Sequence, residues 1–276
     1  MSNSCDGNCS GCADSSCEDR TKESLLKKPL DSTKIKNIIG VVSGKGGVGK
    51  SMTTSILAVN MAKKGYKVGI LDADITGPSI PKIFGVHEKV FGTDEGMLPA
   101  VTKDLKIKMM SVNLMLETEE TPVLWRGAMI ANLLTQFYTD IVWGELDYLF
   151  IDMPPGTGDV ALTTFQSLPI NGIVIVSSPQ ELVSMIVSKA CNMAEMMHIP
   201  VIGLMENMSY VECPKCSEKI YIFGESNINE TAEKHNLKVL GRMPIKPEIA
   251  SLADNGTIEQ FNYDYLDGAV EEIENL

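Results

Sequence analysis

The stretch Gly44-Lys45-Gly46-Gly47-Val48-Gly49-Lys50-Ser51 decides the fold that this chain is expected to adopt. It fits the phosphate-binding pattern G-x-x-x-x-G-K-[ST]. An apolar run at residues 38–42 precedes it, and an amphipathic segment from about residue 51 to 64 follows it. Glycines let backbone N–H groups approach phosphate oxygens, and a following helix adds the positive end of its dipole. The stretch therefore predicts a strand, a phosphate-binding loop and a helix.

Two side chains at the end of this loop have expected roles. Lys50 would contact the β- and γ-phosphates of a nucleotide, and the Ser51 hydroxyl would hold Mg²⁺. The expected nucleotide-binding segment extends from Gly44 through Met52.

From Lys34 onward, apolar strand patterns alternate with amphipathic helix patterns, which predicts a mostly parallel sheet covered on both faces. The expected fold class is α/β, a P-loop NTPase three-layer sandwich. Further strands are expected at residues 66–71, 105–112, 147–151, 172–177, 201–205 and 238–241. Further helices are expected at residues 127–139, 180–198 and 228–235 and in the acidic C-terminal segment.

Composition separates the chain into two parts and excludes some functions. Residues 1–33 form a polar, Cys-rich tail and linker, and residues 34–276 form the ATPase domain, with a Cys-containing insert at 208–224. The net charge of −12 argues against nucleic-acid and anionic-membrane binding. No run approaches roughly 18 apolar residues, and the N-terminus lacks the pattern of a signal peptide. A cytoplasmic protein with reduced thiols is expected, so its seven Cys suggest metal or redox chemistry.

Acidic and amide side chains follow three predicted strands, at the sheet edge where α/β proteins bind ligands. Asp152 follows one of them and precedes a Pro-Gly-rich loop, so it is expected to reach Mg²⁺ directly or through water. Asp74 is favoured over Asp72 for positioning the attacking water, and the other carboxylate would then tie down the loop. Asn207 ends a third strand.

Cys213-Pro214-Lys215-Cys216 places two sulfurs on one tight turn. This is half of a tetrahedral thiolate site, and the neighbouring sequence holds no second pair to complete it. Two such turns facing across a two-fold axis would supply four thiolates, which suits a bridging [4Fe–4S] cluster or a Zn²⁺ ion. A structural zinc knuckle is the alternative.

The remaining cysteines raise a separate question. Cys5, Cys9, Cys12 and Cys17 could hold a second [4Fe–4S] cluster, zinc or a transient metal, or they could belong to a metal-free tail. Cys191 lies in an apolar helix pattern beside several Met residues and is expected in the core.

Lys45 gives the loop a second lysine. With Asp74-Ile75-Thr76-Gly77-Pro78-Ser79, the loop Pro154-Pro155-Gly156-Thr157-Gly158-Asp159 and Glu206-Asn207-Met208-Ser209, the chain resembles the deviant Walker A ATPases. Among these it is most similar to the Mrp-type iron–sulfur cluster carriers, over about residues 34–254. One departure is that Glu225-Ser226-Asn227 follows Phe223-Gly224, where these relatives commonly have further glycines.

The resemblance implies an ATP-hydrolysing homodimer that passes a [4Fe–4S] cluster to apo iron–sulfur proteins. Lys45 would reach the phosphates bound by the other subunit, like an arginine finger supplied in trans. The implied catalytic residues are Lys45, Lys50, Asp74 and Asp152, and Asn207 would contact adenine. ATP, Mg²⁺ and the cluster are the implied cofactors.

Two rival functions use the same fold. A partition or positioning ATPase with a structural zinc would need a basic face or a basic amphipathic C-terminal helix, whereas residues 263–276 are acidic. A small-molecule ligase would leave the Cys213–Cys216 pair unexplained.

Overall fold

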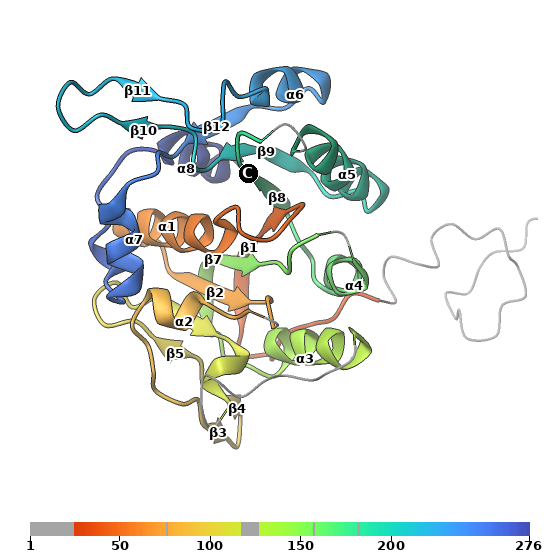
Figure 1. Cartoon of the computed structure of the whole chain (residues 1–276). Coiled ribbons are helices and arrows are strands. Elements are labelled where there is room, and N and C mark those ends of the chain that lie inside the picture. Colours follow the sequence, from red (N-terminus) through yellow and green to blue (C-terminus); the bar gives the residue numbers. More distant parts are fainter. Residues whose placement is uncertain (1–24, 76, 117–126, 157, 181–182) are drawn as a thin grey trace, which may run out of the picture.

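The computed structural model describes residues 25–75, 77–116, 127–156, 158–180 and 183–276. Within these ranges an eight-stranded sheet forms the centre of the molecule, in the order β12-β9-β8-β1-β7-β2-β6-β5 (Figure 1). Its strands are β1 Lys34–Ser43, β2 Val68–Asp72, β5 Ala100–Val101, β6 Lys108–Met110, β7 Glu145–Asp152, β8 Gly172–Ser177, β9 Val201–Glu206 and β12 Val239–Arg242.

The sheet is parallel except at one edge, where β5 runs antiparallel to β6. Strand β1 lies in the middle, between β7 and β8. Its last six residues are all buried, as expected of a strand covered on both faces. The predicted mostly parallel sheet is confirmed.

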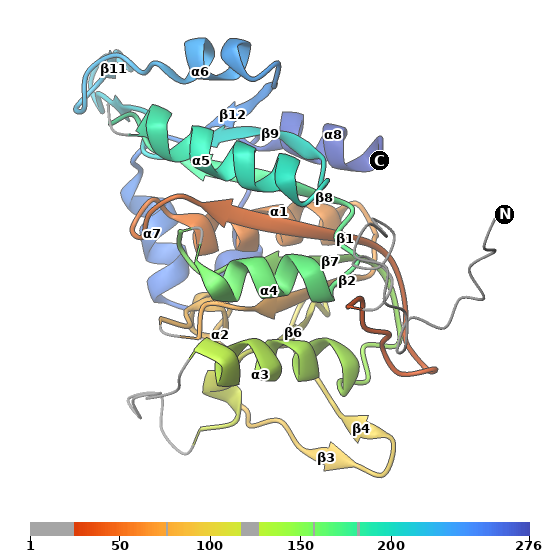
Figure 2. The same ribbon diagram turned by 90° about the vertical axis from the view of Figure 1, so that its right-hand side faces the viewer.

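Helices cover both faces of this sheet. The α-helices are α1 Lys50–Lys63, α2 Ile80–Ile83, α3 Gly127–Thr139, α4 Asp159–Ser167, α5 Val183–Met196, α6 Ile228–Lys234, α7 Pro247–Asp254 and α8 Asp267–Glu274, and the short 3₁₀ helices are η3 Val112–Leu114 and η4 Ile258–Gln260. In Figure 2, α3, α4 and α5 lie in front of the strands, and α1, α7 and α8 lie behind them. The three-layer architecture is therefore confirmed.

Two hydrophobic cores fill the space between the layers, and β1 contributes to both. Ile39 and Val41 pack into the core under α1 and α8, whereas Ile38 and Val42 pack into the core under α3, α4 and α5. This alternation follows from the two-residue period of a strand. It fixes the rotation of β1, and so the direction in which the loop after Ser43 leaves the sheet.

Some elements differ from the predictions. The strand expected at 105–112 is limited to β6, because Lys106 adopts a left-handed backbone with φ 58° and residues 112–114 turn into η3. Helices α2, α4 and α7 were not predicted. Helix α4 begins at Asp159, at the end of a Pro-Gly-rich segment whose composition indicated a loop. Helix α7 begins at Pro247, where the missing N–H costs no intrahelical hydrogen bond.

Two small hairpins lie outside the main sheet. One pairs β3 Gly92–Thr93 with β4 Gly96–Met97, and the other pairs β10 Val211–Glu212 with β11 Lys219–Ile220. We call the second the Cys hairpin, because Cys213 and Cys216 lie in its turn. In Figure 2 the strands of the sheet point to the left, and the Cys hairpin lies at that end. None of the helices in the described ranges is long and apolar enough to cross a membrane.

Candidate nucleotide and thiolate sites

The phosphate loop, residues 44–49, joins β1 to α1 as the sequence predicted. Gly47 and Gly49 have φ values of 79° and 82°, a left-handed backbone that favours glycine. A Cβ at Gly46 or Gly47 would meet no atom within 4 Å. The loop therefore keeps open space beside its backbone, at the N-terminus of α1, where an anion is favoured.

The two ends of the loop are packed tightly against other elements. A Cβ at Gly44 would lie 1.5 Å from Cγ2 of Ile186 in α5. A Cβ at Gly49 would lie 2.0 Å from the side-chain nitrogen of Asn207. Both positions therefore require glycine for close approach, and the loop is held between α5 and the end of β9.

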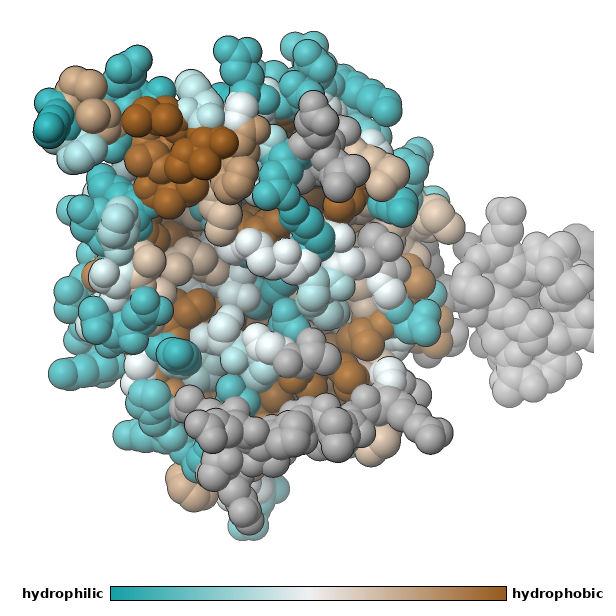
Figure 3. All heavy atoms as spheres, viewed as in Figure 1, coloured by the Kyte–Doolittle hydropathy of each residue, from teal (hydrophilic) through white to brown (hydrophobic). Residues whose placement is uncertain are grey.

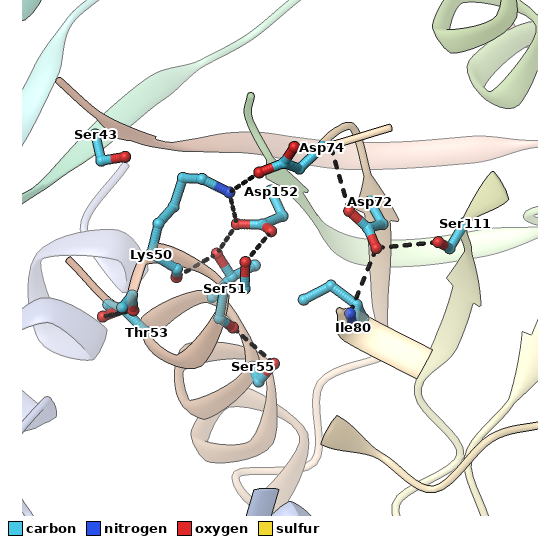
Figure 4. A network of polar contacts seen from close by, with 12 residues as sticks. Ser43, Lys50, Ser51, Thr53, Ser55, Asp72, Asp74, Ile80, Ser111 and Asp152 are labelled. Carbon is cyan, nitrogen blue, oxygen red and sulfur yellow. Dashed lines mark hydrogen bonds and ion pairs between the residues drawn. The ribbon is translucent and has the colours of Figure 1, made fainter. Parts of the chain in front are cut away.

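Lys50 is buried among carboxylates (Figure 4). Its Nζ lies 2.7 Å from Asp152 Oδ1 and 3.9 Å from Asp74 Oδ2. The 2.7 Å contact is an ion pair without hydrogen-bond alignment, and among the described residues this Nζ has no hydrogen-bond partner. A buried ammonium in this condition is suited to a further anionic ligand such as a phosphate.

Asp152 ends β7 and is fully buried beside the start of α1. Its carboxylate accepts hydrogen bonds from Ser51 Oγ at 2.6 Å and from Thr54 Oγ1 at 2.9 Å. The predicted pair Ser51 and Asp152 is thus brought together across 101 residues of sequence. Thr54 was not predicted, although it lies one helical turn after Ser51 and so on the same face of α1.

Asp72 and Asp74 occupy different environments beyond β2. Asp72 is buried, and it accepts hydrogen bonds from the backbone N–H groups of Asp74 and Ile80 and from Ser111 Oγ. Burial, followed by the charge of Asp152 on the neighbouring strand, raises the pKa of Asp72 to about 8. Asp74 is partly exposed beside Lys50. The geometry therefore gives Asp72 the hydrogen bonds that hold the loop, and places Asp74 where the nucleotide is expected.

Lys45 extends from the phosphate loop to the segment before α5, where its Nζ donates a hydrogen bond to Gln180 Oε1. Lys45 itself is partly exposed. Sequence reasoning did not find Gln180, because 135 residues separate it from Lys45.

Asn207 lies against the phosphate loop. Its side-chain nitrogen donates to the Val48 carbonyl at 2.9 Å, its side-chain oxygen accepts from the N–H of Met208, and its own N–H donates to the Ser177 carbonyl. The residue predicted to contact adenine is thus adjacent to the loop, and it links three separate segments.

The Cys hairpin exposes its thiols. Cys216 is exposed and Cys213 is partly exposed. The backbone N–H groups of Lys215 and Cys216 lower the pKa of Cys213, followed by the Cys216 thiol. In the described part of the chain, no group of three or more His, Cys, Asp or Glu side chains could hold a metal ion. Cys213 and Cys216 thus offer two thiols on one turn, and their role as ligands of a metal centre stays a prediction.

The other cysteines are one in helix α5 and four in the N-terminal segment. Cys191 is buried in α5, and burial raises the pKa of its thiol to about 11. Its predicted place in the core is confirmed. Cys5, Cys9, Cys12 and Cys17 lie outside the described residues, so their proposed cluster stays a prediction.

A family model described as a NUBPL iron-transfer P-loop NTPase matches residues 34–274. The chain belongs to this family. It is 46% identical over 270 residues to an iron-sulfur cluster carrier protein of Clostridium perfringens, covering 92% of this chain and 94% of that relative. It is 44% identical over 259 residues to an iron-sulfur cluster carrier protein of Methanocaldococcus jannaschii, covering 91% and 89%. The resemblance to iron–sulfur cluster carriers is confirmed.

Solved structures agree with this membership of the iron-transfer P-loop NTPases. A nucleotide-binding protein from Archaeoglobus fulgidus, solved in complex with ADP, is 46% identical and has a TM-score of 0.78, covering 89% of this chain and 96% of its own. The cell division ATPase MinD of Pyrococcus furiosus is 17% identical with a TM-score of 0.63, covering 87% and 98%, and shows that the fold is shared.

Proposed function

We propose that this iron-transfer P-loop NTPase binds a [4Fe–4S] cluster, transfers it to apo iron–sulfur proteins, and hydrolyses ATP at its phosphate loop. The observation that carries the proposal is the pair Cys213 and Cys216, held on an exposed turn outside an otherwise complete nucleotide-binding fold. Two relatives that cover most of this chain carry the name iron-sulfur cluster carrier protein.

In this proposal the residues of the phosphate loop bind ATP. The N–H groups of residues 44–52 surround the phosphates, and the buried Lys50 exchanges part of its contact with Asp152 and Asp74 for phosphate oxygens. Asn207 then contacts the adenine from the end of β9. The ADP in the Archaeoglobus fulgidus protein supports a nucleotide at this loop.

Ser51 and Asp152 fit Mg²⁺. Both offer oxygen ligands, 2.6 Å apart, beside the loop, and hard oxygen donors are those that Mg²⁺ prefers. When bound, the ion neutralises negative charge that develops on the phosphate oxygens. Asp74 orients the water that attacks the γ-phosphorus, and the bond to the bridging oxygen breaks to release ADP. Asp72 holds the backbone of Asp74 in place through the 3.2 Å hydrogen bond.

Lys45 acts across a two-fold axis. It leaves Gln180 of its own subunit and contacts the phosphates bound by the second subunit, where a cation stabilises the transition state. ATP thereby holds two copies of the chain together. The hydrogen bond between Lys45 and Gln180 is then a feature of the separate subunit.

The same two-fold axis brings two Cys hairpins together. Cys213 and Cys216 of each copy supply four thiolates, which completes the ligand set of one cluster. Exposed large side chains follow the pair in the sequence, namely Ile220, Tyr221, Ile222 and Phe223. Figure 3 shows a brown, hydrophobic patch at its upper left, on the side of the molecule where Figure 1 shows the Cys hairpin. Exposed apolar residues of this kind are typical of a surface that contacts a partner.

The partition-ATPase alternative with a structural zinc is not favoured. The family match and the carrier relatives point away from it. The acidic C-terminal helix α8 also uses its apolar residues Ala269, Val270 and Ile273 in the core, so they are not free to bind a membrane surface.

Anaerobic reconstitution tests the function. We would measure iron, sulfide and cluster transfer to an apo acceptor in a background that replaces Cys5, Cys9, Cys12 and Cys17 with Ser. We expect a transferable cluster at one per dimer, lost in Cys213→Ala/Cys216→Ala and kept in the control Cys191→Ala. A double variant that still transfers a cluster would disprove the bridging site. Stoichiometric zinc without exchange would disprove the carrier function.

A further inference from the structure

One buried carboxylate outside the phosphate site connects both ends of the Cys hairpin. Glu206 is the last residue of β9 and is 1% exposed. Its Oε2 accepts a hydrogen bond from Ser209 Oγ at 2.5 Å, and its Oε1 accepts one from Ser226 Oγ. Ser209 precedes β10, and Ser226 follows β11. The carboxylate therefore joins the chain entering the hairpin to the chain leaving it.

The charge of Glu206 is balanced by a third partner. Arg242, at the end of the neighbouring strand β12, places its Nε 3.6 Å from Glu206 Oε2. Its Nη2 donates to Asn229 Oδ1 in α6 at 2.7 Å. A buried carboxylate is tolerated only when it is paired and hydrogen-bonded, so this cluster fixes the geometry at the base of the hairpin.

The Cys hairpin depends on its base for its orientation. Each of its strands has two residues, and residues 215–225 are exposed. A two-stranded hairpin of this length is marginal by itself. Within the hairpin, Tyr210 makes an edge-to-face contact with Tyr221, and the ammonium of Lys219 lies over the Tyr210 ring.

The strand that enters the hairpin is also held from outside. Ser209 N–H donates to the Met243 carbonyl, and Ile245 N–H donates to the Tyr210 carbonyl. Within the described ranges, no such backbone bond holds the leaving strand at Ser226, so its tie to the sheet runs through Glu206.

The next residue in the chain connects this base to the phosphate loop. Asn207 donates to the Val48 carbonyl at 2.9 Å, and a Cβ on Gly49 would already overlap its side chain. Its side-chain oxygen also accepts from the N–H of Met208, which has a left-handed φ of 58°. Residues 206–209 thus run without interruption from a phosphate-loop contact to the serine that enters the hairpin. A displacement of the phosphate loop at Val48 would therefore act on Asn207, the residue next to Glu206.

We propose that Glu206 is a positioning residue that transmits the nucleotide state of the phosphate loop to the thiolates of the Cys hairpin. It does so by holding Ser209 and Ser226 together beside Asn207. The inference rests on the proposed function, because it assumes that Cys213 and Cys216 hold the cluster. Glu206 contacts neither nucleotide nor cluster in this scheme; it sets the angle at which the hairpin leaves the sheet, and so the fit of two hairpins around one cluster.

The experiment measures how ATP changes the lability of the cluster. The full chain, with Cys5, Cys9, Cys12 and Cys17 replaced by Ser as above and called wild type here, is loaded anaerobically with a [4Fe–4S] cluster. The rate of iron removal by a chelator is then recorded with and without Mg-ATP. For the wild type we expect the two rates to differ by about fivefold or more, the usual scale of coupling between two sites. In Ser209→Ala/Ser226→Ala we expect the ratio of rates to fall within about twofold of one. ATP affinity is expected to stay within about threefold of the wild type, since neither serine contacts the loop.

Matched variants separate positioning from general damage. Ser226→Thr keeps the hydroxyl and is expected to keep the wild-type ratio, whereas Ser226→Ala reduces it. Glu225→Ala removes an exposed carboxylate beside Ser226 and is expected to leave the ratio unchanged. If the double variant does not fold, as judged by thermal unfolding, the Ser226→Ala and Ser226→Thr pair decides the question.

Each negative result would overturn a different claim. A wild-type ratio of one, with a cluster present, would overturn the coupling and leave the carrier function intact. A wild-type ratio retained in Ser209→Ala/Ser226→Ala would overturn the role of Glu206. A wild type that binds no cluster would overturn the proposed function, and this inference with it.

Discussion

The thiols of Cys191 and Cys213 lie in environments that shift their pKa values in opposite directions. Backbone N–H groups stabilise the Cys213 thiolate and lower its pKa, whereas burial raises the pKa of Cys191 to about 11. The thiolate is the nucleophile and the metal ligand. The local surroundings of each residue therefore distinguish a reactive cysteine, Cys213 on the hairpin, from an inert one, Cys191 in α5.

This difference predicts selective alkylation of the metal-free protein. A lower pKa leaves more thiolate at a given pH, and Cys213 is partly exposed to the reagent at the surface, so Cys213 should react at least about tenfold faster than Cys191 at pH 7. The rate at Cys191 should keep rising with pH through pH 9, because its pKa lies above that range. A timed iodoacetamide pulse with peptide mass spectrometry would measure both rates. Equal rates are expected only in the urea-unfolded control, and equal rates in the folded protein would contradict the assignment.

At the scale of elements, the phosphate loop depends on α5 and on the end of β9 as well as on its own glycines. Ile186 of α5 lies against Gly44, and Asn207 lies against Gly49. The loop is therefore held by elements that lie far from it in the sequence. Gly46, by contrast, borders open space.

Alanine substitution of two loop glycines tests this packing. Gly44→Ala should destabilise the protein by about 1–3 kcal/mol, the usual cost of overpacking. Rotating the Ile186 side chain gives no relief, because the new Cβ would also lie 2.9 Å from Ile186 Cβ and 3.1 Å from its carbonyl oxygen. Gly46→Ala is the matched control, expected to change the free energy of unfolding by less than about 0.5 kcal/mol. Urea unfolding measures both, and equal stabilities would show that the α5 contact is not tight.

At the scale of the whole molecule, both proposed sites are incomplete in one copy of the chain. Lys45 is partly exposed and donates a hydrogen bond to Gln180 of its own subunit, and the Cys hairpin offers two thiols. In the proposed dimer, a second copy related by one two-fold axis would complete both sites. The nucleotide contact of Lys45 and the binding of the cluster would then depend on the same association.

The association itself gives a prediction. Wild-type protein should dimerise when Mg-ATP is added, and Lys45→Ala should stay monomeric, because the cation that contacts the second nucleotide is missing. Lys34→Ala removes an exposed lysine at the opposite end of β1 and is expected to dimerise like the wild type. Sedimentation velocity with and without ATP distinguishes the species. An ATP-dependent dimer of Lys45→Ala would show that the lysine does not act across the interface.

The sequence by itself determined the α/β fold, the phosphate loop, the carboxylate Asp152 and the pair Cys213–Cys216. Each of these follows from residues that are consecutive or regularly spaced, so local geometry is enough to predict them. The start of strand β6 was not predicted, because the left-handed backbone of Lys106 decides it. Helix α7 was not predicted either, because tertiary packing decides whether that segment forms a helix.

Only the tertiary structure decided how these pieces are connected. Folding brings Thr54 to Asp152, Ser111 to Asp72, and Ser226 to Glu206, across 98, 39 and 20 residues respectively. No local pattern marks such partners, because a buried polar group takes whichever donor the packing brings near. The physical reason is that burial creates the need for a partner, and the fold alone determines which residue meets it.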